Sequence, residues 1–421
     1  MNITISPAPL HGTVSIIESK SHVHRLLIAA ALSSTPVFIS CNDSSEDIDA
    51  TVRCLNALGA EITRSKDEDG FWVVPFKASQ TAATLECGES GSTLRFLLPI
   101  IGALGKTATI RLSGRLPERP LSPLWEELIA HGVSLTRPQN DTICCSGKLK
   151  AGTFTIKGDV SSQFISGLLF ALPFLDGDSE IVVTGKTESE SYIEMTLQVL
   201  HRVGINIQRV GQNFMICGNQ VAKCSSVAAE GDWSNAAFWL CAGALGSPIT
   251  CKNLYEDSLQ GDRSVIDLLK RFGAVIQTSE TATTVKANQL NGIEIDASNS
   301  PDLVPILAVC GAYAKGTTVI KNAGRLRIKE SDRLAAVSTV LSALGASVTE
   351  TEDGLIIQGQ PQLKGGVTVS SYNDHRIAMA AAVAATLCQD PVTITNAEAV
   401  NKSYPKFWEH LERLGGKIRR D

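Results

Sequence analysis

A pattern of apolar and polar positions recurs six times along the chain. Each copy has an apolar helix end, a glycine and then a short strand of alternating apolar and polar residues, as in LNALGAEIT from Leu55 to Thr63. A glycine after the last helical turn is typical of a left-handed helix C-cap. The six glycines stand 69 to 73 residues apart, which indicates a true repeat. They are Gly59, Gly132, Gly204, Gly273, Gly345 and Gly415.

A second pattern marks the other half of each repeat. A polar start leads into an apolar helix rich in small residues and then into a β-branched strand, as in SHVHRLLIAAAL followed by TPVFIS. Helices that are apolar nearly all round are buried helices. The pattern therefore predicts strands and helices that alternate around an interior helix in each repeat. These helices begin near Ser21, Ser90, Ser161, Asp232, Pro301 and Asn373.

The two ends of the chain predict how the repeats are grouped. The last repeat, from Asn373, has only about 49 residues left, while residues 1–19 form two short strands, NITIS and GTVSII, that belong to no repeat. We expect the amino terminus to complete the last repeat. The prediction is one domain of residues 20–228 and another of residues 1–19 plus 229–421. The chain then crosses twice, near Ser19 and Ala228, which predicts a hinge and an interdomain cleft.

Composition favours a cytoplasmic α/β protein with two cores. The chain has 421 residues, of which 43% are hydrophobic, and this is too long for a single core. It lacks a signal-peptide pattern at the amino terminus, and its apolar runs are too short to span a bilayer. A formal net charge of -5 without a general basic face makes nucleic acid an improbable partner. We expect a monomer.

The cysteines do not predict a metal site. Eleven cysteines occur without a CxxC pair or a Cys/His spacing suited to zinc. In a cytoplasmic chain they are expected to be reduced thiols packed as small apolar groups. We therefore expect no metal and no organic cofactor.

Positive charge is concentrated in RLRIKESDRL, Arg325 to Leu334, at the head of an amphipathic helix. Because the whole chain is acidic, this cluster of Arg325, Arg327, Lys329 and Arg333 is local, and a small anion is its natural partner. The alternative is a solvated helix start with ion pairs to Glu330 and Asp332.

Cations also stand at the starts of several predicted buried helices. Positive charge near a helix amino terminus is mildly destabilising, yet Lys20, Arg25, Arg95 and Arg376 occupy such positions. Helix amides together with cations form sites for phosphate or carboxylate. The alternative is that each cation snorkels or pairs with a neighbour such as Asp374.

Hydroxyl groups and loop cations add to this prediction. The starts ESKS, GESGST and VSSQ are N-caps by default but can also donate to phosphate oxygens. Arg115 and Arg119 lie in a proline-rich loop, and Lys402 follows a predicted strand. His22, His24 and His201 have no evident partners and are expected on the surface or satisfied in the core.

Nine motifs together resemble the enolpyruvyl transferases, and specifically the 5-enolpyruvylshikimate-3-phosphate synthase family of the shikimate pathway. They occur in that family's order over essentially the whole chain, and IKESDRL with NDHRIAMA is highly specific. The motifs are ESKSHVHR, GESGSTLR, LPERP, VSSQF, ESYIEMT, SPDLVP, RIKESDRL, YNDHRIAMA and NKSYP. The resemblance implies an inside-out α/β barrel fold, with two domains that each contain three βαβαββ units.

The resemblance also implies a reaction and the residues that carry it. The enolpyruvyl group of phosphoenolpyruvate would be joined to the 5-hydroxyl of shikimate 3-phosphate through a tetrahedral intermediate, with release of phosphate. Asp302 would be the base on the hydroxyl, and Glu330 would donate and accept the proton at the methylene carbon. Lys20 would contact both substrates, and either Lys20 or Glu330 would deliver the first proton.

The remaining candidate residues are implied substrate contacts. Those for shikimate 3-phosphate are Lys20, Ser21, Arg25, Ser161, Ser162, Gln163, Ser189, Tyr192, Asp302 and Lys329. Those for phosphoenolpyruvate are Lys20, Gly91, Arg119, Gln163, Arg333, Arg376 and Lys402.

Several positions depart from the family pattern. Glu18, Glu89, Phe96 and Arg325 stand where Gly, Asn, Pro and Asn are common. Glu89 near an anion would be repulsive unless it pairs with an arginine. An alanine at position 91 would reduce sensitivity to glyphosate, but this chain has Gly91. We therefore expect glyphosate to inhibit the protein by competing with phosphoenolpyruvate.

Two other functions are compatible with the residues. A UDP-N-acetylglucosamine enolpyruvyl transferase shares the fold and the donor, but such enzymes generally carry a reactive cysteine in a loop where this chain has none, between Cys87 and Cys144. A binding scaffold for phosphorylated ligands would use the cations without needing the acid/base pair Asp302 and Glu330.

Overall fold

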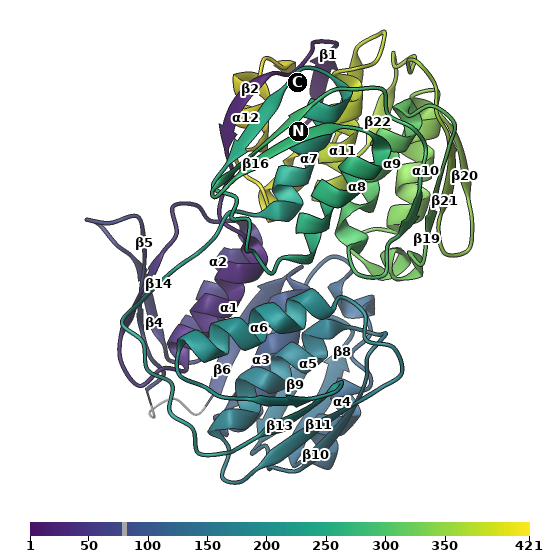
Figure 1. The fold of residues 1–421 in the computed structure, drawn as a ribbon. Helices are drawn as coiled ribbons and strands as arrows, with labels where there is room; N and C mark the ends of the chain where they lie inside the picture. The colour runs from purple at the N-terminus through teal and green to yellow at the C-terminus, as the bar shows by residue number, and fades with distance from the viewer. Residues whose placement is uncertain (78–81) are drawn as a thin grey trace. The chain divides into compact units, whose positions relative to one another are not determined.

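The computed structural model describes residues 1–77 and 82–421 and divides the chain into two compact units (Figure 1). The continuous unit is Lys20–Ala229, and the split unit combines Met1–Ser19 with Glu230–Asp421. The hinge and the interdomain cleft stay predictions. No helix of the described residues has the length and hydropathy needed to cross a membrane.

The continuous unit is built from three four-stranded sheets in the described part of the chain, with strand orders β14-β3-β5-β4, β6-β7-β9-β8 and β10-β11-β13-β12. Its helices are α1 (Lys20–Ala31), α2 (Glu46–Ala57), α3 (Gly91–Ala103), α4 (Leu124–Ala130), α5 (Ser162–Ala171) and α6 (Glu190–Arg202), with short 3-10 turns η1 (Leu116–Glu118) and η2 (Leu172–Phe174). Its strands are β3 (Val37–Ser40), β4 (Glu61–Arg64), β5 (Gly70–Val74), β6 (Ala82–Gly88), β7 (Thr107–Leu112), β8 (Val133–Gln139), β9 (Thr142–Gly147), β10 (Thr153–Lys157), β11 (Ser179–Thr184), β12 (Gln208–Val210), β13 (Asn213–Ile216) and β14 (Ser226–Ala228).

The split unit has the same plan, with sheets ordered β16-β17-β15-β2, β18-β19-β21-β20 and β22-β23-β1-β24. Its helices are α7 (Trp233–Leu245), α8 (Val265–Phe272), α9 (Val304–Tyr313), α10 (Arg333–Ala343), α11 (His375–Ala385) and α12 (Phe407–Arg413), with 3-10 turns η3 (Gly261–Ser264), η4 (Pro301–Leu303), η5 (Gly324–Ile328) and η6 (Ala397–Lys402). Its strands are β1 (Ile3–Ser6), β2 (Gly12–Ser15), β15 (Ile249–Lys252), β16 (Val275–Ser279), β17 (Ala282–Lys286), β18 (Glu294–Asp296), β19 (Thr317–Lys321), β20 (Ser347–Glu350), β21 (Leu355–Gln358), β22 (Thr368–Ser370), β23 (Val392–Thr395) and β24 (Lys417–Arg420).

Every sheet repeats one arrangement of strands. Each sheet has one parallel pair of strands, as β10 with β11, and its other pairs are antiparallel, as β11 with β13 and β12 with β13. In four of the six sheets of the described chain a buried helix joins the parallel strands directly, as α5 joins β10 and β11, whereas β14 with β3 and β2 with β15 come from distant parts of the chain. Each repeat is therefore a βαβαββ unit. The six repeat glycines have φ between 84° and 110°, so the predicted left-handed positions are confirmed.

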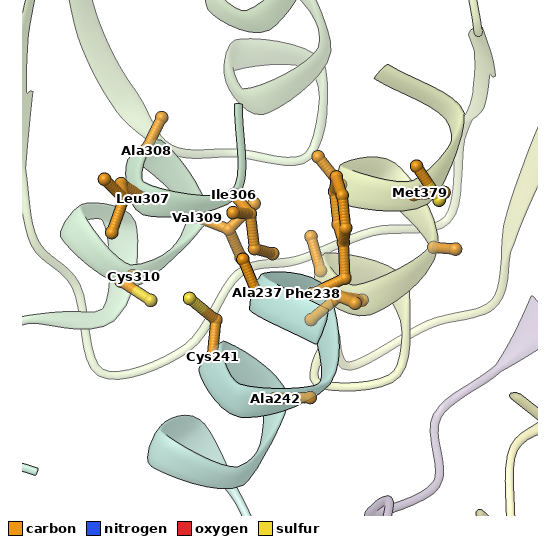
Figure 2. Close-up of a cluster of buried hydrophobic side chains, with 14 of the residues drawn as sticks. Ala237, Phe238, Cys241, Ala242, Ile306, Leu307, Ala308, Val309, Cys310 and Met379 are labelled. Atoms are coloured by element: carbon orange, nitrogen blue, oxygen red, sulfur yellow. The ribbon is translucent and has the colours of Figure 1, made fainter. Parts of the chain in front are cut away.

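The predicted interior helices are also confirmed. Serine or aspartate caps four of them, with Ser90 before α3, Ser161 before α5, Asp232 before α7 and Asp374 before α11. In the split unit, α7, α9 and α11 bury small and apolar side chains against one another (Figure 2). The sulfur atoms of Cys241 in α7 and Cys310 in α9 point toward one another, whereas Leu307 and Ala308 point away from α7. Small residues such as Ala237 let these helices approach closely.

The amino-terminal strands join two different sheets of the split unit (Figure 1). Strand β1 lies between β23 and β24 of the last repeat and is antiparallel to both. Strand β2 does not join the last repeat as we expected but pairs in parallel with β15 of the fourth. Strand β2 precedes α1 in the chain but pairs with β15, the strand that follows α7. Strand β14 precedes α7 but pairs with β3, the strand that follows α1.

All eleven cysteines lie in the described part of the chain and are free thiols. Eight are buried, including Cys54 and Cys87, whose sulfur atoms are 3.9 Å apart. The expectation that they pack as small apolar groups is confirmed for these eight, whereas Cys217 is exposed.

Candidate active site

In the split unit, the candidate residues lie at the starts of α9, α10 and α11. Asp302 is in η4 before α9, Lys329 and Glu330 lie between η5 and α10, and Arg333 is the first residue of α10. Asp332 caps α10 by accepting from the amide of Ala335 (3.1 Å). The apolar side chains that follow Arg333 in α10 are buried, which confirms the predicted amphipathic helix. The Asp332 cap and the burial of the apolar side chains of α10 thus fix the backbone positions from which these charged side chains extend.

The guanidinium group of Arg333 holds three carboxylates together. Its Nη1 is 2.8 Å from Asp302 Oδ1, its Nη2 is 2.8 Å from Glu330 Oε2, and its Nε is 2.8 Å from Asp374 Oδ2. The Arg333 side chain is 1% exposed, whereas those of Asp302 and Glu330 keep 19% and 17%. The two carboxylates predicted to transfer protons are therefore gathered by one buried cation and still reach solvent.

Asp302 is also surrounded by two other cations. Arg376 Nη2 is 3.0 Å from Asp302 Oδ2, and Lys329 Nζ is 3.8 Å from Oδ1. Burial by itself raises the pKa of Asp302, but the charges of Arg376, Lys329 and Arg333 outweigh burial and hold the pKa well below its usual value. Asp302 is therefore ionised at neutral pH.

Lys402 is placed at the edge of the same unit's α11. Its Nζ donates to the carbonyl of Asn373 at 2.6 Å, directly before the Asp374 cap, and the residue is 7% exposed. The carboxylate of Asp374 accepts from the amide of Arg376 (2.9 Å) and the hydroxyl of Ser331 (3.0 Å).

Not every arginine of the charged stretch takes part. Arg327 pairs with Asp332 and Glu350, and Arg325 donates to the carbonyl of Ser298. The alternative of ordinary ion pairs at a helix start therefore holds for Arg327. Lys329 and Arg333 are the members of the stretch that pair with Asp302.

In the continuous unit, the first candidates lie on α1. Lys20 Nζ is 2.8 Å from Asp47 Oδ2, and both side chains are less than one fifth exposed. Arg25 is 2% exposed and donates to Thr196 Oγ1 (2.8 Å), the Ser21 carbonyl (2.7 Å) and the Tyr192 carbonyl (3.0 Å). Burial lowers the pKa of Arg25 to about 10, which leaves it charged at neutral pH. Arg25 thus ties the start of α1 to α6.

The starts of α3 and α5 are joined by side chains. Gln163 accepts from Arg95 Nη1 (2.9 Å) and donates to Ser92 Oγ (2.8 Å). A Cβ placed on Gly91 would lie 2.8 Å from Arg95 Nη1 and 3.0 Å from Arg119 Nη1. The backbone at Gly91 therefore lies directly against two guanidinium groups, a strongly positive environment for an anion.

The hydroxyl candidates occupy helix starts. Ser161 caps α5 through the amide of Gln163 (3.3 Å), and Ser162 is the first residue of that helix. Ser189 precedes α6 in a left-handed conformation with φ 54°, and Tyr192 lies in the first turn. Glu89 lies outside these helices, and its carboxylate packs over Gly114.

Two aspartates, Asp47 and Asp262, were missed from the sequence, and a third, Asp374, was named only as a possible partner of a neighbouring cation. Asp374 binds Arg333 and caps α11, and Asp47 pairs with Lys20. The position of Asp374 in the NDHR motif was a usable signal, although it pairs with Arg333 and not with the Arg376 guanidinium. Asp262 of η3 is 1% exposed and accepts a short hydrogen bond from Ser234. No group of three or more potential metal ligands occurs among the residues the structure describes.

Asp262 makes stability depend on pH. Burial raises its pKa to about 6, and the charge of Asp302 acts in the same direction, against Arg376. Since the folded state binds this proton more tightly than the unfolded state, stability falls as pH rises from about 4 through 6. In Asp262→Asn this loss is absent. The difference in unfolding free energy, variant minus wild type, is expected to rise by about 2 kcal/mol between pH 4.5 and 7.5. Denaturation of both proteins at each pH measures it, and a constant difference contradicts the assignment.

Comparison with known proteins identifies the family. A sequence model described as EPSP synthase (3-phosphoshikimate 1-carboxyvinyltransferase) matches residues 5–411. A 3-phosphoshikimate 1-carboxyvinyltransferase from Clostridium novyi is 46% identical, covering 99% of this chain and 98% of its own. One from Clostridium acetobutylicum is 45% identical with the same coverage.

Solved structures show the same fold. An EPSP synthase from Acinetobacter baumannii superimposes with a TM-score of 0.82 at 23% identity and covers 100% of both chains. The enolpyruvyl transferase NikO from Streptomyces tendae gives 0.79 at 19% identity, with 99% and 98% coverage. The predicted fold class, an inside-out α/β barrel of βαβαββ repeats, is thereby confirmed. From the family match and the curated relatives, the chain belongs to the EPSP synthase (3-phosphoshikimate 1-carboxyvinyltransferase) family.

Proposed function

We propose that this chain transfers the enolpyruvyl group of phosphoenolpyruvate to the 5-hydroxyl of shikimate 3-phosphate and releases phosphate. The observation that carries the assignment of roles is that one guanidinium group, that of Arg333, binds Asp302 through Nη1 and Glu330 through Nη2. A scaffold that only binds anions has no use for two partly exposed carboxylates among its cations. We further propose that residues 20–228 and 1–19 plus 229–421 are its two domains, and that it acts as a cytoplasmic monomer.

Asp302 is the proposed base that takes the proton of the attacking hydroxyl. Three cations surround Asp302 and lower its pKa. Asp302 is therefore a weak base as long as no other anion binds to these cations. The carboxylate and phosphate groups of the substrates draw on the same cations, so binding raises the basicity of Asp302 when it is needed. This coupling favours deprotonation only after the substrates have bound.

Glu330 is the proposed acid and base at the methylene carbon. In the addition, the hydroxyl oxygen bonds to C2 of phosphoenolpyruvate while a proton adds to the methylene carbon. In the elimination, the new methyl group loses a proton, the bond from C2 to the phosphate oxygen breaks, and phosphate leaves. Lys20 and Glu330 are both candidates for delivery of the first proton, and the ion pair of Lys20 with Asp47 supports a charged ammonium group.

Cations of both units are the proposed contacts of phosphoenolpyruvate. Such cations stabilise the negative charge that builds up on the carboxylate and on the departing phosphate. The proposed set is Lys20, Gly91, Arg119, Gln163, Arg333, Arg376 and Lys402. The closeness of Gly91 to Arg119 supports this set. Because position 91 is glycine and not alanine, we expect glyphosate to compete with phosphoenolpyruvate.

The proposed contacts of shikimate 3-phosphate lie mainly at helix starts of the continuous unit. Hydroxyl groups and free amides at these starts suit a phosphate ester. The set is Lys20, Ser21, Arg25, Ser161, Ser162, Gln163, Ser189, Tyr192, Asp302 and Lys329. The bonds of Arg25 use three of its five N–H groups, which supports a role in positioning Ser21 and Tyr192 as well as in binding.

A phosphate-release assay with two acceptors tests this function. Phosphoenolpyruvate with shikimate 3-phosphate is expected to give stoichiometric phosphate, whereas phosphoenolpyruvate with UDP-N-acetylglucosamine gives none. Release with the UDP-sugar alone would assign the chain to the other enolpyruvyl transfer. No release with either acceptor, despite binding of phosphoenolpyruvate, would leave only the scaffold function.

A further inference from the structure

Four buried side chains of the continuous unit form an unbroken hydrogen-bonded chain from α1 through α2 to α3. His24 Nδ1 lies 2.6 Å from Thr51 Oγ1, which lies 2.7 Å from Thr93 Oγ1. The Thr93 hydroxyl donates to Ser90 Oγ at 2.7 Å, and the Thr93 amide donates to the same oxygen at 3.3 Å. All four residues are at most 1% exposed. The proposed chemistry uses none of them.

The direction of this chain follows from the number of hydrogens available. A hydroxyl has one hydrogen, and that of Thr93 goes to Ser90, so Thr93 must accept from Thr51. The single hydrogen of Thr51 is then used, and His24 Nδ1 must be the donor to Thr51. His24 is therefore protonated at Nδ1.

The surroundings of His24 fit a neutral ring with this proton arrangement. Burial and the charges of Lys20 and Arg25 lower its pKa well below the usual 6.5. Its Nε2 is buried with no hydrogen-bond partner among the described residues. A buried acceptor without a partner is tolerated better than a buried N–H group without one. Nε2 is therefore the unprotonated nitrogen.

The chain ends at the helix start that the proposed function uses. Ser90 is the N-cap of α3, and the next residue, Gly91, supplies the amide proposed to bind phosphoenolpyruvate. The backbone there lies directly against two guanidinium groups, because a Cβ at position 91 would lie 2.8 Å from Arg95 Nη1 and 3.0 Å from Arg119 Nη1. A rotation of the first turn of α3 would move the Gly91 amide relative to both guanidinium groups.

We propose that His24, Thr51 and Thr93 are positioning residues that act through Ser90 to hold the first turn of α3 in the orientation that binds phosphoenolpyruvate. The inference rests on the proposed function, since it takes Gly91 as part of that substrate's site. The three side chains touch no substrate and transfer no proton. They affect the KM for phosphoenolpyruvate and do not affect the acid/base step.

Replacing Thr51 tests the chain at its middle link. Thr51→Val keeps the shape of the side chain and breaks both hydrogen bonds, and it is expected to raise KM for phosphoenolpyruvate about fivefold to tenfold. The KM for shikimate 3-phosphate and kcat should stay within about twofold of wild type, because the substitution removes no hydrogen bond from the groups that bind shikimate 3-phosphate or transfer protons. Thr51→Ser keeps the hydroxyl and should restore KM.

Thr318→Val is the matched control. Thr318 is a fully buried threonine of β19 whose hydroxyl has no hydrogen-bond partner in the described part of the chain. Its removal should leave all three kinetic constants unchanged. An unchanged KM for phosphoenolpyruvate in Thr51→Val, or equal changes for both substrates, overturns the proposal. Absence of turnover in the wild-type protein would instead reject the proposed function.

A second measurement on the unmodified protein tests the chain independently of kinetics. Nitrogen-15 NMR of histidine-labelled protein, with the His24 signal assigned by its loss in His24→Asn, should show Nδ1 protonated and Nε2 unprotonated at neutral pH. The opposite tautomer, or a doubly protonated ring, would contradict the deduced direction of the chain.

Discussion

Replacing Asp302 by asparagine or Glu330 by glutamine is expected to lower kcat by about 10³-fold, within the range that general acid/base groups contribute. Binding should survive, because each substitution removes a negative charge from among the cations that hold the anionic substrates. Asp302→Asn leaves Arg376 and Lys329 without their carboxylate partner, so affinity for phosphoenolpyruvate should not fall. Steady-state kinetics together with calorimetric binding measure the two effects separately.

The matched control for these substitutions is Asp267→Asn. Asp267 is exposed and pairs only loosely with Lys270 at 3.8 Å, so kcat should be unchanged. A kcat within tenfold of wild type in both Asp302→Asn and Glu330→Gln would remove them as acid/base groups.

Replacing Arg333 by methionine is expected to destabilise the split unit by about 3–5 kcal/mol, the usual cost of removing one partner from a buried ion pair. Methionine retains the volume of the side chain but leaves Asp374, which is 0% exposed, without its counter-charge. Fluorescence of Trp233 and Trp239, both in α7 of the same unit, follows its unfolding in denaturant.

Two further variants separate charge from packing at this position. Arg333→Met combined with Asp374→Asn removes the buried unpaired charge and should recover part of the loss. Arg419→Met removes a cation that is 73% exposed and pairs with Asp421, and it should change stability little. A loss below about 1 kcal/mol in Arg333→Met, typical of an exposed pair, would show that this guanidinium does not organise the three carboxylates.

The repeats could be predicted because their signals are local. Gly59 and the five equivalent glycines end helices with positive φ, and serine or aspartate caps precede the buried helices, so neighbouring residues alone specify these positions. The partner of β2 could not be predicted in this way. Strand pairing joins residues far apart, as Val14 with Cys251, and nothing in the sequence GTVSII distinguishes the fourth sheet from the last.

The chemistry could be predicted in part for a related reason. Cations at the starts of α1 and α11 break a local rule, which predicted a bound anion, with pairing to a neighbouring residue as the alternative. The sequence favoured a ligand, but the structure shows that Asp47 and Asp302 already pair with Lys20 and Arg376. These aspartates are 27 and 74 residues away from their partners, so only the folded chain identifies them.

In the proposed reaction a proton adds to the methylene carbon of phosphoenolpyruvate and a proton is then lost from the same carbon. The most direct test is to run the reaction in D₂O with phosphoenolpyruvate and shikimate 3-phosphate and to analyse the product by mass spectrometry and NMR. The methyl group formed in the addition carries hydrogens from phosphoenolpyruvate together with deuterium from the solvent. Elimination should therefore leave deuterium in the methylene group of the product. Product formed without deuterium at that carbon would contradict the addition and elimination.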